Sequence, residues 1–95
     1  MKISIELSLY PLADVHYKSE IWSFIKRLRQ INGLTVVTNG MSTQVFGDYD
    51  LAVNNVMAEI KQVHQNIFDQ TGEEGAAVFV CKFINGDRSI VEAES

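Results

Sequence analysis

The chain of 95 residues has one cysteine, one proline and fewer basic than acidic residues. The single cysteine, Cys81, excludes a disulfide within the chain and favours a reducing compartment. Eight Lys and Arg against twelve Asp and Glu give a net charge of −4. This balance argues against a nucleic-acid partner, which usually needs a clustered basic face. The short basic group of Lys26, Arg27 and Arg29 is best interpreted as a solvated helix face.

Long apolar runs are also missing from the sequence. No run approaches the ~20 residues that a membrane-spanning helix needs, and residues alternate from Lys2 onward instead of forming the apolar core of a signal peptide. We therefore expect a soluble, cytoplasmic protein with no membrane partner. The length suits a single domain, 1–95, and the apolar fraction of 46% is ordinary for a folded chain.

Hydrophobic periodicity predicts most of the elements. Residues 3–10 alternate between apolar and polar side chains up to Pro11, which favours a strand with one apolar face. The period changes to 3.6 over 17–31 and again over 51–71, which is typical of two amphipathic helices. The run 76–84 is apolar at both alternating positions, as in a strand that is buried on both faces.

A hairpin is predicted in the middle of the chain. Short runs over 34–38 and 41–47 flank Asn39-Gly40, the strongest short-range hairpin signal. Asp50 follows the second run and is a plausible N-cap for the second helix. A two-residue loop would give the pairs Thr38–Met41, Val36–Thr43 and Leu34–Val45.

The order strand–helix–strand–strand–helix–strand is the split βαβ pattern. It predicts a ferredoxin-like α+β fold, with an antiparallel four-stranded sheet in the order 4-1-3-2 and both helices on one face. The other face would then be bare. The tail, 88–95, would be loose or would add a short strand through Ile90 and Val91.

The bare face would carry polar side chains on its two central strands. The last strand would place apolar groups beside them, which indicates that a subunit, a small ligand or both cover part of this face. A covered Glu6 would need a donor, because an unpaired buried carboxylate is costly. Lys82 or a ligand amine could supply it. The outward polar residues of the central strands are Ser4, Glu6, Ser8, Ser42 and Gln44.

The segments 39–50 (NGMSTQVFGDYD) and 3–12 (ISIELSLYPL) resemble the signature of the YkoF-like family, which binds thiamin or hydroxymethylpyrimidine. The helix end 25–28 and the strand 78–83 match in kind, so the resemblance spans nearly the whole chain. It implies a ferredoxin-like fold that assembles through its sheets into homodimers or homotetramers. It also implies non-catalytic binding of thiamin or its pyrimidine moiety in salvage, transport or buffering, with no cofactor besides such a ligand.

The resemblance also implies a set of ligand-binding positions, and residue chemistry extends it. A carboxylate such as Glu6 can accept from an aminopyrimidine amine, and Gln44 can both donate and accept. Phe46, Phe83 or Trp22 could stack on the ring. The positions implied by the matching motifs are Ser8, Tyr10, Asn39, Met41, Ser42 and Thr43.

Two other functions stay open at this point. An enzyme has little support, because Cys81 lies in an apolar strand where a thiolate is disfavoured, and His16 and His64 have no fixed relation to it. Neither a Cys-x-x-Cys motif nor a paired histidine gives metal-ligand spacing, so we expect no catalytic or metal-ligating residue. The alternative to ligand binding is a structural or regulatory homo-oligomeric module without a small-molecule ligand.

Overall fold

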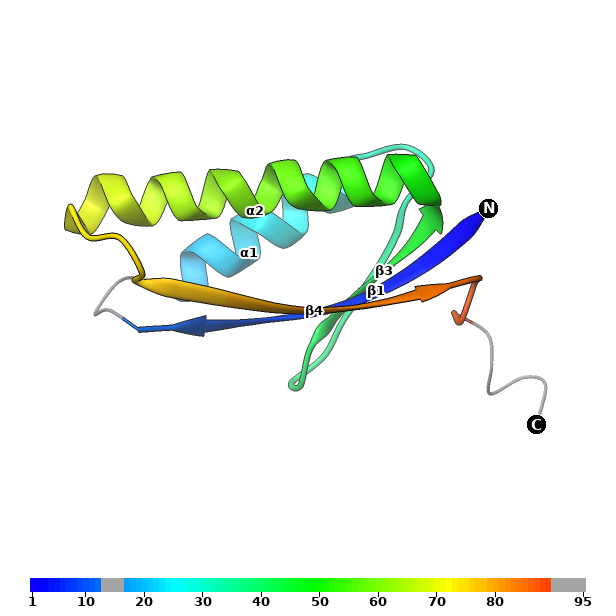
Figure 1. Cartoon of the computed structure of the whole chain (residues 1–95), viewed down its shortest axis with the longest axis horizontal. Helices are drawn as coiled ribbons and strands as arrows, with labels where there is room; N and C mark the ends of the chain where they lie inside the picture. Colours follow the sequence, from blue (N-terminus) through cyan, green and yellow to red (C-terminus); the bar gives the residue numbers. More distant parts are fainter. Residues whose placement is uncertain (13–16, 90–95) are drawn as a thin grey trace.

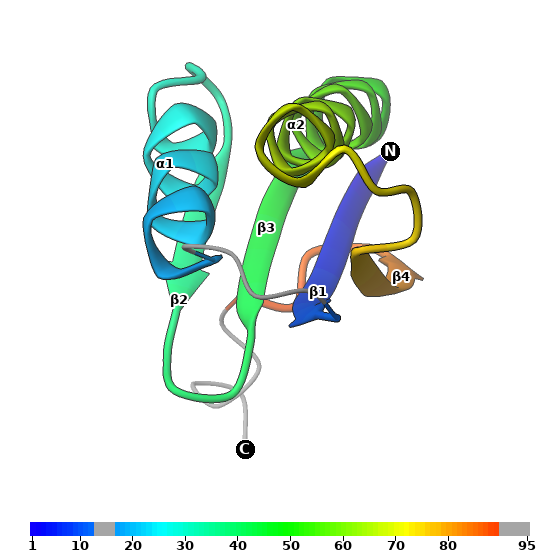
Figure 2. The same cartoon turned by 90° about the vertical axis from the view of Figure 1, so that its left-hand side faces the viewer.

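The computed structural model describes residues 1–12 and 17–89. Its sheet is antiparallel in the order β2-β3-β1-β4, and both helices cover one face (Figure 1, Figure 2). The predicted ferredoxin-like α+β fold is therefore confirmed. His16 and the expected strand through Ile90 and Val91 lie outside the described residues. The elements are β1 (Lys2–Pro11), α1 (Tyr17–Arg29), β2 (Thr35–Thr38), β3 (Thr43–Asp48), α2 (Tyr49–Thr71) and β4 (Ala77–Asn85).

The hydrophobic core lies between the helices and the sheet. Ile3, Ile5 and Leu7 are buried because alternate side chains of a strand share one face, here the face that the helices cover. The helices contribute residues at helical spacing, as the sequence predicts. Those buried on α1 are Phe24, Ile25 and Leu28, and those on α2 are Ala52, Val56, Ile60, Val63 and Ile67. Among the described helices, none is long and apolar enough to cross a membrane.

The β2–β3 hairpin has a four-residue loop, so the predicted two-residue loop is wrong. Thr38 pairs with Thr43 and not with Met41. The side-chain oxygen of Asn39 accepts hydrogen bonds from the backbone N–H groups of Met41 at 2.8 Å and Ser42 at 3.1 Å, which stabilises the wider loop. The register moves by two residues, and because side chains alternate with a period of two, every residue keeps its predicted face.

The start of α2 also differs from the prediction. The helix begins at Tyr49, with Asp48 in the N-cap position and Asp50 inside the first turn. Asp48 makes no capping hydrogen bond with its side chain, and its carboxylate pairs with Lys2 at 3.1 Å. Asp50 still favours the helix, because a negative charge is stabilised near a helix N-terminus. The helix ends at Thr71, as predicted.

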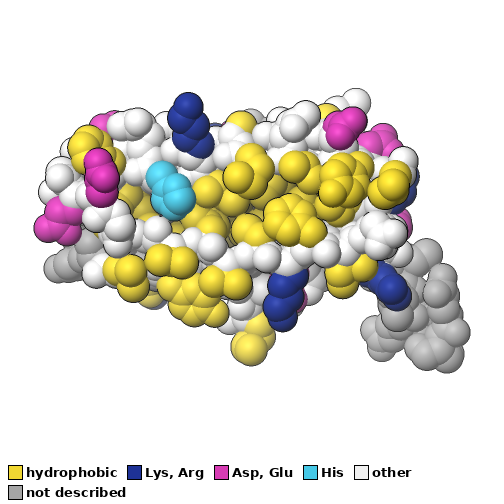
Figure 3. Space-filling model, in the orientation of Figure 1, with side chains coloured by type: hydrophobic (Ala, Val, Ile, Leu, Met, Phe, Trp, Pro, Cys, Tyr) yellow, Lys and Arg dark blue, Asp and Glu magenta, His cyan; other side chains and the backbone are white. Residues whose placement is uncertain are grey.

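The apolar pattern of β4 predicted a strand that is buried on both faces, and this prediction is wrong. Strand β4 lies at the edge of the sheet. On the open face Val78 and Val80 are 42% and 48% exposed, because both helices lie on the other side. On the helical side Phe83 is 49% exposed, whereas Phe79 and Cys81 pack against the core. Apolar side chains consequently gather on the surface along α2 and β4 (Figure 3).

Candidate functional site

A cavity of about 540 Å³ lies at the end of β1. Strand β3 pairs with β1 only as far as Thr43, opposite Leu7, whereas β4 follows β1 to Pro11. In the described part of the chain, residues 8–11 therefore pair only with β4, and no strand pairs with their other edge. The first half of α1 and the hairpin loop form the other walls. The cavity volume is in the range of small-molecule sites.

Six of the eight predicted binding residues line this cavity. Their side chains do not all share one face of the sheet: Ser42 reaches the open face, whereas Thr43 is buried beneath the helices, where its hydroxyl lies 2.9 Å from that of Thr38. Met41 stands at the loop tip and is almost fully exposed. The six residues are Ser8 and Tyr10 from β1, and Asn39, Met41, Ser42 and Thr43 from the hairpin.

Glu6 and Gln44, the other two predicted residues, do not line the cavity. They face each other across β1 and β3 in the middle of the open face. The Oε2 of Glu6 accepts a hydrogen bond from the Ser42 hydroxyl at 3.0 Å, and its Oε1 lies 3.6 Å from the Lys82 ammonium. Lys82, expected as a possible donor, is thus present, and the carboxylate is satisfied without a ligand amine.

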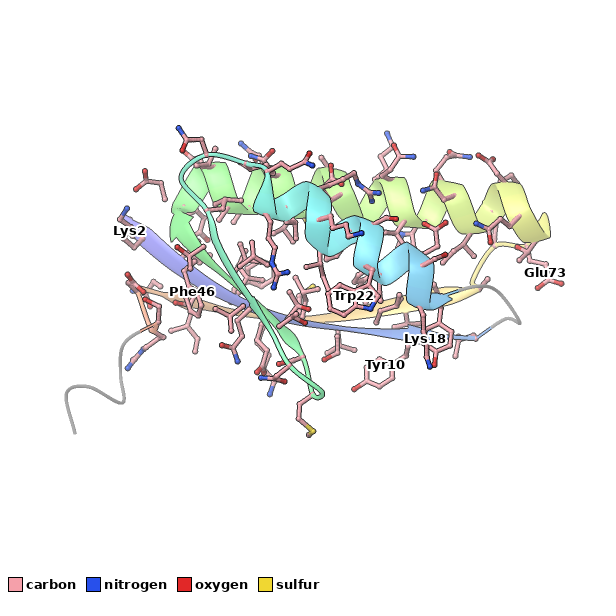
Figure 4. All side chains as sticks on the ribbon, turned by 180° about the vertical axis from the view of Figure 1, so that it is seen from behind. Lys2, Tyr10, Lys18, Trp22, Phe46 and Glu73 are labelled. Atoms are coloured by element: carbon pink, nitrogen blue, oxygen red, sulfur yellow. The ribbon has the colours of Figure 1, made fainter. Side chains whose placement is uncertain are left out.

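Helix α1 supplies a wall that the sequence did not predict. Lys18 and Trp22 both point from α1 toward the sheet, whereas the Tyr10 ring projects from the end of β1 on the opposite, open face (Figure 4). The signal that could have found this wall is their spacing, since residues four apart share one side of a helix. Trp22 is the one expected stacking residue that lines the cavity. The others, Phe46 and Phe83, lie elsewhere on the sheet.

The whole open face was predicted to be bare, but its opposite end is covered. The Ser4 hydroxyl donates to the carbonyl of Gly86 at 2.8 Å and accepts from the backbone N–H of Arg88 at 2.9 Å. Ser4 and its neighbour in the sheet, Phe46, are 6% and 7% exposed. The chain that follows β4 therefore crosses this end of the sheet, and the exposed part of the open face lies toward the cavity.

A second cavity, of about 420 Å³, lies between the end of α2 and the start of β4. It contains none of the predicted binding residues. Its lining includes Lys61, His64 and Phe68, and the His64 ring packs edge-on against Phe79 with ring centroids 5.5 Å apart. His64 is therefore a surface side chain whose ring packs against the edge of the core.

The side chains that line the first cavity are suited to binding a ligand. Its described lining has hydroxyls, an amide and aromatic rings, and no cysteine, histidine or carboxylate. Cys81 lies away from it on β4, where burial raises the pKa of the thiol and so disfavours the nucleophilic thiolate. Within residues 1–12 and 17–89, no three His, Cys, Asp or Glu side chains are placed to hold a metal ion. Such a cavity can hold a flat polar ring by stacking and hydrogen bonds.

The sequence matches no protein-family model and no curated protein significantly. The fold, in contrast, is similar to solved structures. One, from Thermotoga maritima, is provisionally described as a thiamine biosynthesis/salvage protein; it has a TM-score of 0.66 and 13% identity, over 100% of both chains. A hypothetical protein from Methanocaldococcus jannascii has a TM-score of 0.65 and 20% identity, over 98% of this chain and 91% of that one.

A protein from Streptococcus pneumoniae is similar to the same degree, with a TM-score of 0.65 and 20% identity over 99% of this chain and 97% of the other. In all three cases nearly the full length of both chains is aligned. The agreement in length and topology shows a shared fold. The chain therefore has the architecture of a small ferredoxin-like protein whose structural neighbours include one connected with thiamine.

Proposed function

We propose that this protein binds thiamin or its hydroxymethylpyrimidine moiety without catalysing a reaction, as a YkoF-like protein in salvage, transport or buffering in the cytoplasm. The observation that carries the proposal is the cavity at the end of β1, which brings six of the eight expected binding residues together beside Trp22. The shared fold of the Thermotoga maritima protein supports it.

The edge of β1 offers a backbone pair that suits an aminopyrimidine. The N–H of Leu12 donates to the carbonyl of Ala76 at 2.7 Å, so the backbone groups of even-numbered residues in β1 point toward β4. Those of Leu9 consequently point the other way, into the side that β3 leaves open. An adjacent N–H and C=O can pair with a ring nitrogen and an exocyclic amine, which gives the ligand a fixed orientation.

Aromatic and hydroxyl groups complete the match. Trp22 is half-exposed over the cavity and can stack on a flat ring. Ser8 and Ser42 offer hydroxyls that donate or accept, according to what the ligand presents. Few polar groups around an apolar wall give orientation through hydrogen bonds and affinity through burial.

The sole tryptophan of the chain makes this proposal directly testable. We expect thiamin or hydroxymethylpyrimidine to change Trp22 fluorescence saturably and to release heat in calorimetric titration. Trp22→Ala should weaken binding by about 1–3 kcal/mol, the range for stacking of a base on an aromatic ring. Ser8→Ala should weaken it by about 0.5–1.5 kcal/mol, for one hydrogen bond.

Tyr49→Ala is the matched control, because Tyr49 is a half-exposed aromatic residue that lies outside this cavity. It should bind as the wild type does. Each variant is first checked for a native circular dichroism spectrum. Absence of heat and of a fluorescence change with both ligands at high protein concentration would contradict the proposed function.

A second candidate function, the homo-oligomeric module, is favoured by the surface next to the cavity. Tyr10, Val78 and Val80 are 55%, 42% and 48% exposed and are neighbours on the open face. We propose that a homodimer or homotetramer covers this apolar group, because contiguous exposed apolar surface usually marks an interaction site.

Light scattering should therefore return a multiple of the 10.7 kDa chain mass, and Val80→Glu should shift the mass toward 10.7 kDa. The control is Val37→Glu, which introduces the same charge at an exposed valine on β2. A wild-type mass of one chain at micromolar concentration would count against assembly. An oligomer that gives no heat with either ligand would favour the module over the ligand-binding protein.

A further inference from the structure

This inference rests on the proposed function. The charge of the cavity favours some of the ligands that the proposed function allows over others. Among the described lining residues Lys18 alone carries a formal charge. We infer that the cavity selects a ligand with an anionic group, so that the phosphate ester of hydroxymethylpyrimidine binds better than the free alcohol and better than the cationic thiamin.

The ammonium group of Lys18 is available for such a ligand. No carboxylate pairs with it within residues 1–12 and 17–89. Its side chain points from the first turn of α1 toward the sheet, on the same side of the helix as Trp22 (Figure 4). A ring stacked on Trp22 would thus place a short substituent one helical turn away, where Lys18 can reach it.

Among the described residues, the acidic groups nearest to Lys18 in sequence or in the sheet are already bonded elsewhere. Glu20, in the first turn of α1, accepts hydrogen bonds from Asn66 at 3.2 Å and Gln70 at 2.9 Å, both on α2. Glu6 is held by Lys82 and Ser42 on the open face. Neither carboxylate lines the cavity. Its described walls therefore have a net positive charge, which repels a thiazolium ring and attracts a phosphate.

The positive charge also agrees with the direction of the helix. The cavity is lined by Tyr17 and Lys18, the first two residues of α1, so the positive end of the helix dipole lies at the same wall as the ammonium group. Both contributions act on an anion in one place. The Lys18 side chain supplies the specific contact, because an ammonium can donate a charge-assisted hydrogen bond to a phosphate oxygen.

The test is a set of calorimetric titrations with hydroxymethylpyrimidine, its phosphate ester, thiamin and inorganic phosphate. We expect the ester to bind the wild type roughly tenfold more tightly than the alcohol, which is the size expected of one charge-assisted hydrogen bond. Lys18→Gln should remove this preference, so that the ester and the alcohol bind with similar affinities. Rising ionic strength should reduce the preference, since the pair is partly exposed.

Lys26→Gln is the matched control, because Lys26 is on the same helix and does not line the cavity. It should keep the preference for the ester. Equal affinities for ester and alcohol, tighter binding of thiamin than of either, or inorganic phosphate competing as well as the ester would each overturn this inference while leaving the proposed function in place. Failure of all the organic ligands to bind would overturn the proposed function itself.

Discussion

Replacing Phe24 with alanine is expected to lower the free energy of unfolding by about 3–5 kcal/mol, the usual cost of deleting a buried aromatic ring. Phe24 is fully buried between α1 and the sheet, and its ring lies 5.5 Å from that of Phe79 on β4. The substitution removes the packing of the ring and leaves a cavity that the surrounding core cannot fill completely. Total stabilities of small domains are only about 5–15 kcal/mol, so the loss is a large fraction.

Urea unfolding followed by circular dichroism measures this effect. Phe68→Ala is the control, because Phe68 is 42% exposed on α2 and its ring is already partly in water. It should cost less than about 1 kcal/mol, in proportion to the smaller area that is returned to solvent. Equal losses for the two variants would show that α1 is not anchored through Phe24.

Removing the carboxylate of Glu59 should lower the free energy of unfolding by about 2–3 kcal/mol, because it leaves Arg27 without its counter-charge. Arg27 Nε donates to Glu59 Oε2 across the two helices, and the side chains are 31% and 21% exposed. Nη2 of Arg27 is buried without a hydrogen-bond partner among the described residues. Glu59→Ala would leave this cation between the helices with no counter-charge. Loss of one partner of a fully buried pair costs about 3–5 kcal/mol, and partial exposure reduces this.

A double substitution separates the stranded charge from the loss of the pair itself. Arg27→Met combined with Glu59→Leu should recover most of the stability, because apolar side chains of similar size can replace a buried ion pair at little cost. The control is Lys2→Met with Asp48→Leu, an ion pair with both side chains mostly exposed. That change should be within about 1 kcal/mol of the wild type. A single Glu59→Ala variant as stable as the wild type would contradict the expectation.

The position of Arg27 also shows where the sequence was misleading. A basic residue beside Lys26 and Arg29 was interpreted as part of a solvated face, whereas Arg27 lies between the helices. The distinction depends on how α1 turns relative to α2, which is set by packing between distant segments. Local periodicity, in contrast, correctly predicted the inward face of β1 and the end of α2, because each depends on neighbouring residues.

The candidate site was predicted in part, and the missing part follows from the hairpin. With the expected two-residue loop, β3 would have extended to Met41 and paired with β1 as far as Leu9. The hydrogen bonds of Asn39 instead close a four-residue loop, so β3 begins at Thr43 and the end of β1 remains open. The cavity lies along this open end of β1. Trp22 was one of three residues expected to stack on a ligand ring, but which of the three lies at the cavity depends on the tertiary fold that brings α1 to the end of β1.

The sequence could not predict what covers β4, because a strand has the same apolar pattern whether a helix or a second subunit packs on it. The structure shows that neither helix covers Val78 and Val80. On the other side of the strand the expected burial holds for Phe79 and Cys81, which pack against the core, and fails for Phe83, which is half-exposed.

The hydrogen bonds of Ser4 with Gly86 and Arg88 have a geometrical consequence for any stacking of two sheets. Since residues 86–88 occupy that end, a second copy stacked on this face would contact the part of the sheet that carries Val80. Because Tyr10 belongs both to this surface and to the cavity, such a contact would lie directly beside the cavity.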